Sequence, residues 1–440
     1  MKLGLIAMSG VRAWSKELND IGMTMPGVVE RGKVIASMPT LSLLTLAALT
    51  PDDIEVSYHE VRDLRTHEGF DDHDFDLVAI ASQSAQISDA NTLAHHFRAR
   101  GTRVIMGGIH VTSMPDEALQ HADAIVTGEG EPVWPDVLRD ARRKRLQKQY
   151  CADASFHLAD APIPRYDLLD IDRYNRLLIQ TCRGCPHRCD FCASSILLVP
   201  GYTTKPAHRI RAELDAITSI WPHPFIELAD DNSFASPAHT RAICSAFKDK
   251  GVRWFAETDV SIAQHPDLLD ELRESGCRQV LLGLESPRTT GLDHIETRAN
   301  WKLRQLSKYE HAVHTIQSHG ITVNGCFVLG LDGDTPEVFD DIYNFAQRTS
   351  LYDVQVSVLT PFPGTPLYNR LRAENRLLQP TEWSACTLFD VNFQPKHMTP
   401  DELQQGLVDL ARRLYDPAFV LQRRQRFFDH ARNRGWATPE

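Results

Sequence analysis

The sequence lacks a long apolar segment. None of the runs in its 440 residues approaches the roughly 20 apolar residues that a membrane-spanning helix requires. The N-terminus, MKLGLIAMSGV, reaches Arg12 and Trp14 without the apolar stretch and the small-residue cleavage site of a signal peptide. We therefore expect a protein with no membrane span and a cytoplasmic location.

Positive charge is also in short supply. Lys and Arg number 47 against 58 Asp and Glu, which gives a net charge of −11. A net negative charge repels a polyanion, so we expect no nucleic-acid partner. The apolar fraction of 42% is ordinary for a globular protein, and a chain of this length predicts two or three domains.

Cysteine is sparse and unevenly placed. The nine cysteines are an odd number, which does not suit a disulfide framework. Four of them fall between positions 182 and 192. This crowding indicates a metal site.

Residues 1–150 alternate short apolar runs with longer amphipathic stretches. Runs that are apolar on both faces and joined by helices predict a Rossmann-like, doubly wound parallel sheet, an α/β fold whose ligands bind at the C-terminal ends of the strands. The expected strands are Leu3–Met8, Ile54–His59, Leu77–Ala81, Val104–Met106 and Ala124–Thr127.

Small and polar residues follow three of these expected strands. Glycines at such positions let the backbone approach a bulky ligand closely. We expect these strand ends to form a ligand site. The residues are Ser82, Ser84, Gly107, Gly108, His110, Thr127, Gly128, Glu129 and Gly130.

A second βα series begins after a connecting segment at 151–175. Its six units predict a partial (β/α)6 TIM-type barrel over residues 176–370. Residues 371–440 have a helical pattern, in which Thr399 and Glu402 predict a capping box. The expected barrel strands are Leu177–Thr181, Phe225–Ala229, Arg253–Thr258, Val280–Leu284, Thr322–Leu329 and Asp353–Leu359.

Cys185, Cys189 and Cys192 form a CxxxCxxC motif at the entrance to this second series. Composition alone would produce a given three-cysteine spacing about 0.004 times per chain. Thiolates this close together favour a soft metal centre, and three of them on a cubane iron–sulfur cluster leave one iron open. The alternatives are a closed zinc site that adds Cys182 or His187, or four cysteines without metal.

The motif resembles the signature of the radical S-adenosylmethionine (SAM) enzymes, in which an aromatic residue, here Phe191, precedes the last cysteine. The resemblance implies that the three motif cysteines are catalytic and hold a [4Fe–4S] cluster. It also implies that SAM chelates the fourth iron and that its reductive cleavage yields a 5′-deoxyadenosyl radical. The electron would come from a donor such as flavodoxin or ferredoxin.

Three later segments resemble SAM contacts of the same family. In that family, a polar motif after the second barrel strand receives the amino group, a carboxylate ends the fourth strand, and a fifth-strand element lies against the adenine. The corresponding residues here are Asp230, Asp231, Asn232, Glu285, Val328 and Gly330. From the residues alone, the aspartates also suit a capping turn, Glu285 a salt-bridged or surface carboxylate, and Gly330 a simple turn.

The first 150 residues resemble the cobalamin-binding domain that precedes the barrel in one large class of radical SAM enzymes. The matching segments are 107–112, 115–118 and 128–131. The resemblance implies that the strand-end residues named above contact cobalamin. We expect His110 to line the pocket rather than to bind cobalt.

One motif of classical cobalamin domains, Asp-x-His-x-x-Gly, is not matched. Asp71 and His73 are present, but Asp76 stands where the glycine is required. We therefore expect His73 to be an exposed surface residue, because charged runs are usually solvated. For the same reason we expect the basic run at 423–426 to be a solvated helix face.

Together the resemblances imply a cobalamin-dependent radical SAM enzyme that transfers a methyl group to an unactivated carbon of a small molecule. One alternative is a radical SAM cyclase, oxidase or rearrangement enzyme that transfers no methyl group. Another is a non-enzymatic regulator that binds cobalamin or a metal. The sequence does not identify the substrate.

Overall fold

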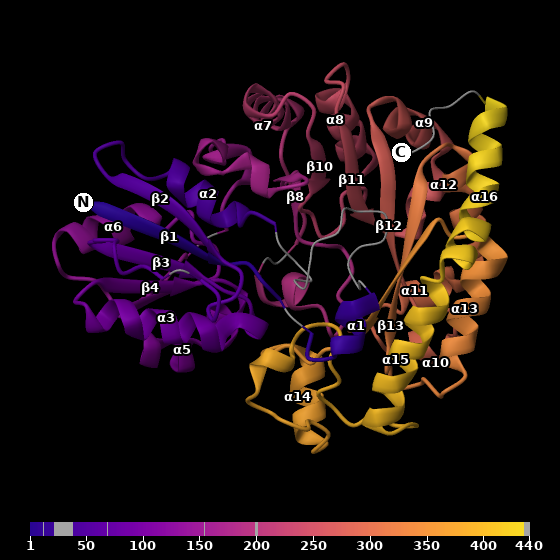
Figure 1. Ribbon diagram of the computed structural model, residues 1–440. Helices are drawn as coiled ribbons and strands as arrows, with labels where there is room; N and C mark the ends of the chain where they lie inside the picture. The colour runs from indigo at the N-terminus through magenta and orange to yellow at the C-terminus, as the bar shows by residue number, and fades with distance from the viewer. Residues whose placement is uncertain (12, 22–37, 68, 154, 199–200, 435–440) are drawn as a thin grey trace.

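Two parallel six-stranded sheets form the body of the protein in a computed structural model, with the N-terminal sheet on the left of Figure 1 and the second sheet on the right. The structure describes residues 1–11, 13–21, 38–67, 69–153, 155–198 and 201–434. Within these ranges no helix is both long enough and apolar enough to cross a membrane. The predicted α/β class is confirmed.

The N-terminal sheet is wholly parallel, in the order β2-β1-β3-β4-β5-β6. The order reverses between β1 and β3, which is the switch point where doubly wound sheets bind ligands. All five predicted strands are present, and a sixth, β6, extends the edge. The strands are β1 (Lys2–Met8), β2 (Glu55–Val61), β3 (Leu77–Ala81), β4 (Arg103–Gly107), β5 (Ala124–Thr127) and β6 (Gln149–Cys151).

Helices cover both faces of this sheet. Leu3 and Leu5 of β1 share a core cluster with the helices on one face, whereas Ile6 lies in the cluster of the opposite face. Successive side chains of a strand point to opposite faces, so β1 buries apolar side chains on both sides of the sheet. The first face carries α2 (Leu41–Ala48) and α6 (Trp134–Arg142), and the second carries α3 (Ile87–Ala99) and α5 (Pro115–His121).

The second sheet is an open barrel. Its strands lie in chain order, β7-β10-β11-β12-β13-β14, all parallel, and the first does not pair with the last among the described residues. The predicted partial barrel is thus confirmed. The strands are β7 (Leu177–Ile179), β10 (Phe225–Leu228), β11 (Arg253–Thr258), β12 (Cys277–Glu285), β13 (Thr322–Leu329) and β14 (Asp353–Val358).

Helices pack on the outer face of the barrel sheet (Figure 1). Val280, Leu282 and Leu284 of β12 belong to this helix-covered core, so the residues between them face the barrel interior. The main helices are α7 (Ala207–Ile220), α8 (Pro237–Phe247), α9 (Pro266–Glu274), α12 (Tyr309–Ser318) and α13 (Val338–Thr349). Shorter helices of this half are α1 (Lys16–Ile21), α10 (Thr289–Leu292) and α11 (Trp301–Gln305), whereas the short α4 (Ile109–Ser113) belongs to the N-terminal sheet.

The C-terminal region contains α14 (Pro366–Ala373), α15 (Pro400–Leu414) and α16 (Pro417–Arg434). The capping box of Thr399 and Glu402 is present at the start of α15, as predicted.

This region also reaches back to the N-terminal sheet. Trp383 joins the core cluster beneath α3 and α5, and its indole N–H donates to Glu117 of α5 at 3.1 Å.

One expectation for α16 is wrong. Arg423 was expected on a solvated face but is buried, because its guanidinium donates to the carbonyls of Leu351 at 2.6 Å and Tyr352 at 3.1 Å. Arg424 is ion-paired with Asp353 at the start of β14. Arg423 and Arg424 therefore anchor the last helix to the barrel, whereas Gln425 and Arg426 are exposed as expected.

Candidate functional site

The cysteine loop, residues 184–193, leaves the barrel just after its first strand. It lies between two short antiparallel strands, following β8 (Cys182–Arg183) and leading through a π-helix at Ser194–Leu198 toward β9 (Thr203–Thr204). Two backbone bonds attach the loop to the segment after β12, from Asp190 N–H to the Ile295 carbonyl at 2.8 Å and from Thr297 N–H to the Arg188 carbonyl at 2.9 Å. The loop is thus held along its length.

The three motif cysteines are free thiols in this loop, with Cys189 buried and Cys185 and Cys192 half-buried. Burial raises the pKa of Cys185 to about 11 and raises the pKa of the other two as well. Without a cation the thiols therefore stay protonated, and a positively charged metal centre is what would stabilise them as thiolates. Three soft donors in this setting fit an iron–sulfur cluster.

The residues of the zinc alternative have other partners. Cys182 is buried, and its thiol donates to the Asn232 carbonyl at 3.5 Å. His187 Nε2 lies 2.9 Å from Asp259 Oδ2. Among the described residues, no three His, Cys, Asp or Glu side chains gather as ligands for a single ion, whereas the thiolates of a cubane cluster bind three separate irons.

Asp230, the first residue of the polar motif after β10, is fully engaged by the protein. Its carboxylate accepts from the Thr181 N–H at 2.7 Å, the Cys182 N–H at 2.9 Å, the Thr181 hydroxyl at 2.5 Å and the Ser233 hydroxyl at 2.9 Å. These bonds tie the end of β10 to the end of β7. The geometry gives Asp230 a positioning role, and its predicted contact with SAM stays a prediction.

The next two residues of that motif face the cysteine loop. Asp231 accepts from the Gly184 N–H at 3.0 Å and from the Ser194 hydroxyl, at the two ends of the loop. The Asn232 side-chain amide donates to Asp259 at 2.8 Å and lies 4.0 Å from Cys185 Sγ. The polar motif and the cysteine loop therefore lie side by side, and the predicted SAM contacts of Asp231 and Asn232 stay predictions.

Glu285 ends β12 in the left-handed region of backbone space, with φ of 61°. Its carboxylate accepts from Lys302 Nζ at 2.8 Å, and the same ammonium donates to the Gly283 carbonyl at 2.8 Å. Burial alone would lower the pKa of Lys302, but the charge of Glu285 raises it well above the usual value. Glu285 is thus ion-paired inside the barrel mouth.

The fifth-strand element, whose contact with adenine stays a prediction, lies at the end of β13. Val328 is buried near the end of β13, and Gly330 adopts φ of 87° in the turn that follows. The Gly330 N–H donates to Asp334 at 3.0 Å, and a Cβ at this position would lie 2.7 Å from Leu403. Phe191 packs at the edge of the barrel core.

Sequence reasoning did not identify Glu257. This residue of β11 alternates with Trp254 and Ala256 of the outer core and so faces the barrel interior. Burial, with the carboxylates of Glu227 and Asp231 nearby, raises its pKa to about 8. The available signal in the sequence was a charged residue directly after the apolar run Trp254–Ala256 of this strand.

The strand-end loops of the N-terminal sheet are shaped by glycine. Gly108 has φ of 113°, and a Cβ there would lie 2.7 Å from the Ser82 carbonyl oxygen. Gly128 has φ of 72° and open space where a Cβ would point. A Cβ added at Gly107 or Gly130 would lie at least 3.6 Å from its nearest neighbouring atom. These loops therefore leave room next to the backbone.

His110 lies beneath these loops rather than at their surface. Its Nδ1 is 3.0 Å from the Ser84 hydroxyl, its Nε2 is 3.5 Å from Glu117, and its ring packs edge-on against Trp383. No part of the side chain is solvent-exposed. Its predicted role in lining a cofactor pocket stays a prediction. His73, in contrast, is exposed as expected.

An ion-paired cluster joins the two regions, and we call it the Arg183 clamp. Arg183 of β8 donates to Glu129 at 2.6 Å and to Glu131 at 2.8 Å, both in the loop after β5. Glu129 also accepts from the Phe156 N–H at 2.7 Å. Burial works against the charged guanidinium, but the two carboxylates outweigh it and raise the Arg183 pKa.

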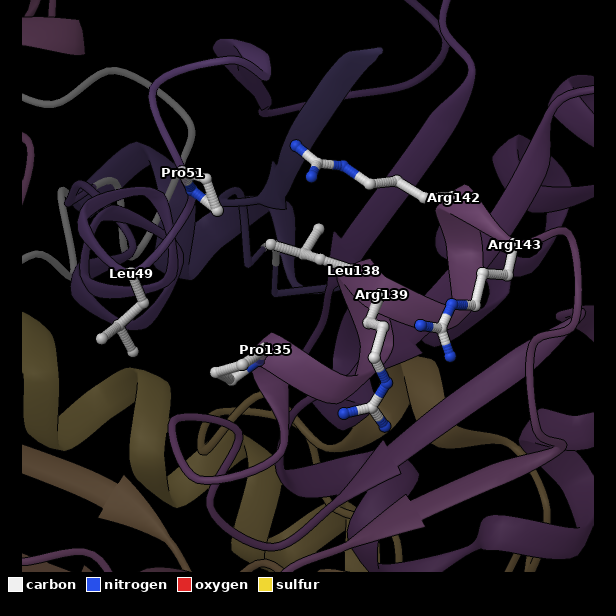
Figure 2. A pocket seen from close by; sticks show the side chains of 7 residues that line it. All are labelled: Leu49, Pro51, Pro135, Leu138, Arg139, Arg142 and Arg143. Carbon is white, nitrogen blue, oxygen red and sulfur yellow. The ribbon is translucent and has the colours of Figure 1, made fainter.

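Surface hollows occur both away from this site and next to it. One, of about 310 Å³, lies between α2 and α6, where Leu49 and Pro51 face Pro135 and Leu138 (Figure 2). It therefore lies among the helices that cover one face of the N-terminal sheet. Another, of about 320 Å³, borders the cysteine loop at residues 186–188 and 296–301.

Three family profiles match the chain in order. They are a B12 binding domain at residues 28–138, the radical SAM superfamily at 179–346, and a domain of unknown function, DUF4070, at 365–439. The second match contains the cysteine loop, and the first contains most of the strand-end loops.

Curated relatives align over most of the chain. A bacteriochlorophyllide d C-12(1)-methyltransferase of Chlorobaculum tepidum is 26% identical over 405 residues, which cover 90% of this chain and 86% of that protein. A hopanoid C-2 methylase of Rhodopseudomonas palustris is 26% identical over 412 residues, covering 90% and 75%. An anaerobic magnesium-protoporphyrin IX monomethyl ester cyclase of Cereibacter sphaeroides is 26% identical over 343 residues, covering 71% and 55%.

The fold also matches solved structures. The radical SAM methyltransferase TsrM from Kitasatospora setae, solved with cobalamin and a [4Fe-4S] cluster, superposes with a TM-score of 0.68 and 16% identity, covering 95% of this chain and 89% of that one. At this identity the likeness concerns the fold. The two family matches show that the chain carries a B12-binding domain at residues 28–138 ahead of a radical SAM domain at 179–346, and the cysteine loop lies in the second of these.

Proposed function

We propose that this protein is a cobalamin-dependent radical SAM methyltransferase that acts on an unactivated carbon of a small molecule. The Arg183 clamp carries the proposal, because it joins the strand-end loop of the B12-binding domain to the strand that leads into the cysteine loop. Two cofactor regions that meet through buried ion pairs are suited to a reaction that needs both. Relatives named as methyltransferases support the same reading.

In this proposal Cys185, Cys189 and Cys192 hold a [4Fe–4S] cluster that also binds SAM. Bound together, these groups supply radical chemistry, and cobalamin supplies a transferable methyl group; the protein binds and orients them. The proposed SAM contacts are Phe191, Asp230, Asp231, Asn232, Glu285, Val328 and Gly330.

Several of these residues form hydrogen bonds or ion pairs with other parts of the protein. Asp231 fixes both ends of the cysteine loop, and Asp230 fixes the strand ends beneath it. Since both carboxylates already hold protein donors, their main contribution is to keep the loop in one geometry. Glu285 and Lys302 neutralise each other in the barrel mouth, which limits the cost of burying either charge.

Cobalamin in this proposal lies against the strand ends of the N-terminal sheet. Gly128 and its neighbours leave the backbone uncovered there, which suits a flat and bulky ligand. The proposed contacts are Ser82, Ser84, Gly107, Gly108, His110, Thr127, Gly128, Glu129 and Gly130. We divide the chain into a cobalamin domain (1–150), a linker (151–175), a barrel (176–370) and a helical region (371–440).

A cytoplasmic location and a low-potential electron donor such as flavodoxin or ferredoxin complete the proposal. The second candidate function is radical cyclisation without methyl transfer, which the similarity to anaerobic cyclases favours. Both candidates use the same cysteine loop, so the fate of the methyl group separates them.

The test follows that methyl group. The protein is reconstituted with iron, sulfide and hydroxocobalamin under anaerobic conditions, given SAM with a trideuterated methyl group and a reductant, and quenched in acid. We expect mass spectrometry to find trideuteromethyl-cobalamin. Cleavage of SAM to 5′-deoxyadenosine with no labelled cobalamin would contradict the methyltransferase and support the cyclase.

A further inference from the structure

The start of α14 contacts the middle of the cysteine loop. The carbonyl of Asp190 accepts from the Leu367 N–H at 3.0 Å, and its carboxylate accepts from Arg370 at 2.9 Å. Asp190 lies between Cys189 and Phe191 of the motif. Because the first N–H groups of a helix have no partner within the helix, Asp190 satisfies one of them for α14. The C-terminal region therefore binds the cysteine motif itself.

The turn before α14 is packed on two sides. Gly364 has φ of 82°, and a Cβ there would lie 3.1 Å from Leu197 and 3.3 Å from Ser113. Leu197 belongs to the π-helix that follows the cysteine loop, and Ser113 ends α4 of the N-terminal domain. The close packing against both neighbours fixes the place where α14 begins.

Arg370 links two carboxylates that differ in their other partners. Its guanidinium donates to Asp190 and to Asp332, which lies in the turn after β13. Asp332 also pairs with Arg376 at 3.0 Å and with Lys396 at 2.8 Å. Within the described part of the chain Asp190 pairs with Arg370 alone, although its side chain is only 12% exposed. Loss of Arg370 would therefore leave a largely buried carboxylate within the motif without a counter-ion.

An unpaired carboxylate at this position would act on a bound cluster. A [4Fe–4S] core on three thiolates is anionic, and its reduction adds one more negative charge. Negative charge close to the cluster disfavours that reduction. Arg370 compensates the charge of Asp190, which directly follows Cys189. It thus removes an obstacle to reduction that the motif itself contains.

We propose that Arg370 is a positioning residue for the cluster. It neutralises Asp190 and, together with the Leu367 N–H, holds the middle of the cysteine loop in the conformation that binds iron. The inference rests on the proposed function, because it assumes a cluster on this loop. It assigns a role to the start of the C-terminal region, whose family profile begins at residue 365 and is described as a domain of unknown function.

The test measures how readily the cluster is reduced in full-length protein without SAM. Wild type, Arg370→Gln, Asp190→Asn and the double variant are reconstituted anaerobically with iron and sulfide and poised with redox mediators at the wild-type midpoint potential. Visible absorbance then gives the ratio of reduced to oxidised cluster. We expect Arg370→Gln to lower this ratio about tenfold and Asp190→Asn to raise it, whereas the double variant returns close to the wild-type ratio.

Arg376→Gln is the matched control. Arg376 belongs to the same network but pairs with Asp332 and not with Asp190. Its ratio of reduced to oxidised cluster should equal that of the wild type.

An unchanged ratio in Arg370→Gln would overturn the proposal. Shifts of Arg370→Gln and Asp190→Asn in the same direction would overturn it too, because they would report damage to the loop rather than a change of charge. If Arg370→Gln fails to retain iron, recovery of iron in the double variant supports the proposal and continued loss overturns it. A wild-type protein that binds no cluster iron would instead refute the proposed function itself.

Discussion

The cysteine loop and the strand-end loops of the N-terminal sheet are built in opposite ways. Side chains fix the first, since Asp231 binds both of its ends and Asn232 lies against Cys185. Backbone shape defines the second, where Gly108 requires a left-handed conformation and Gly128 leaves open space. A metal centre needs donor atoms at given points, whereas a large planar cofactor needs a surface without obstruction.

This difference explains how readily each site can be recognised in a sequence. Donor atoms require particular residue types at particular spacings, so the cysteine motif is specific. A cleared surface requires only small residues, which also occur in ordinary turns. The Arg183 clamp joins the two kinds of site.

The largest expected effect separates the motif cysteines from their neighbour. Replacing Cys185, Cys189 or Cys192 by Ser should remove nearly all cluster iron after anaerobic reconstitution, because a ligand is lost from a three-thiolate site. Cys182→Ser is the matched control and should keep its iron, since the Cys182 thiol donates to a carbonyl instead. Iron and sulfide analysis with visible absorbance checks this, and iron loss in Cys182→Ser would break the assignment.

A second experiment tests whether the open space beside the glycines defines the proposed cobalamin site at the strand ends. Gly128→Val should weaken cobalamin binding at least about tenfold, because the new side chain fills space that a ligand would occupy, while cluster iron stays unchanged. Gly101→Val is the control, since Gly101 also has positive φ and open space but lies between α3 and β4, away from the strand C-terminal ends. Equal affinity in both variants, measured by absorbance titration, would count against the cobalamin site.

The third experiment concerns the clamp that links the regions. Arg183→Gln leaves Glu129 and Glu131 buried without a counter-ion, so we expect a loss of about 3 kcal/mol in unfolding free energy and weaker cobalamin retention. Arg165→Gln breaks an exposed pair with Asp167 and should cost less than about 1 kcal/mol. Denaturant midpoints give both values. Similar shifts for the two variants would show that the clamp stabilises the fold no more than an exposed ion pair does.

The smallest expected effect sits inside the barrel, at Glu257. Burial raises its folded-state pKa to about 8, so the folded protein binds more protons than the unfolded chain between about pH 4.3 and 8. The free energy of unfolding should therefore fall as pH rises through this window and level off above about pH 8. Because Glu257 is only half-buried, we expect a total fall of about 2 kcal/mol. Glu257→Gln should flatten that slope in urea midpoints measured from pH 5 to 8.5, and an unchanged slope would exclude Glu257 as its source.

Much of the fold follows from local sequence signals. Apolar runs of the right length, such as Leu77–Ala81, become strands at the expected places, and the capping box at Thr399 and Glu402 begins a helix as predicted. The CxxxCxxC loop is equally local. The conformations involved are decided within a few residues of the chain.

What sequence reasoning missed depends on distant partners. Arg423 is buried because carbonyls of residues 351 and 352 lie beside it, and Asp230 is engaged because the ends of two strands meet there. Glu131 pairs with a residue 52 positions away. Tertiary contacts select these partners, and no local pattern encodes them.

One measurement tests the central claim, that a single chain holds both cofactors at regions joined by the Arg183 clamp. The protein is reconstituted anaerobically with iron, sulfide and hydroxocobalamin, passed over a sizing column, and analysed for iron, cobalamin and protein in the same fraction. We predict about four irons and one cobalamin per chain. A chain that retains its four irons but elutes without cobalamin would contradict the claim.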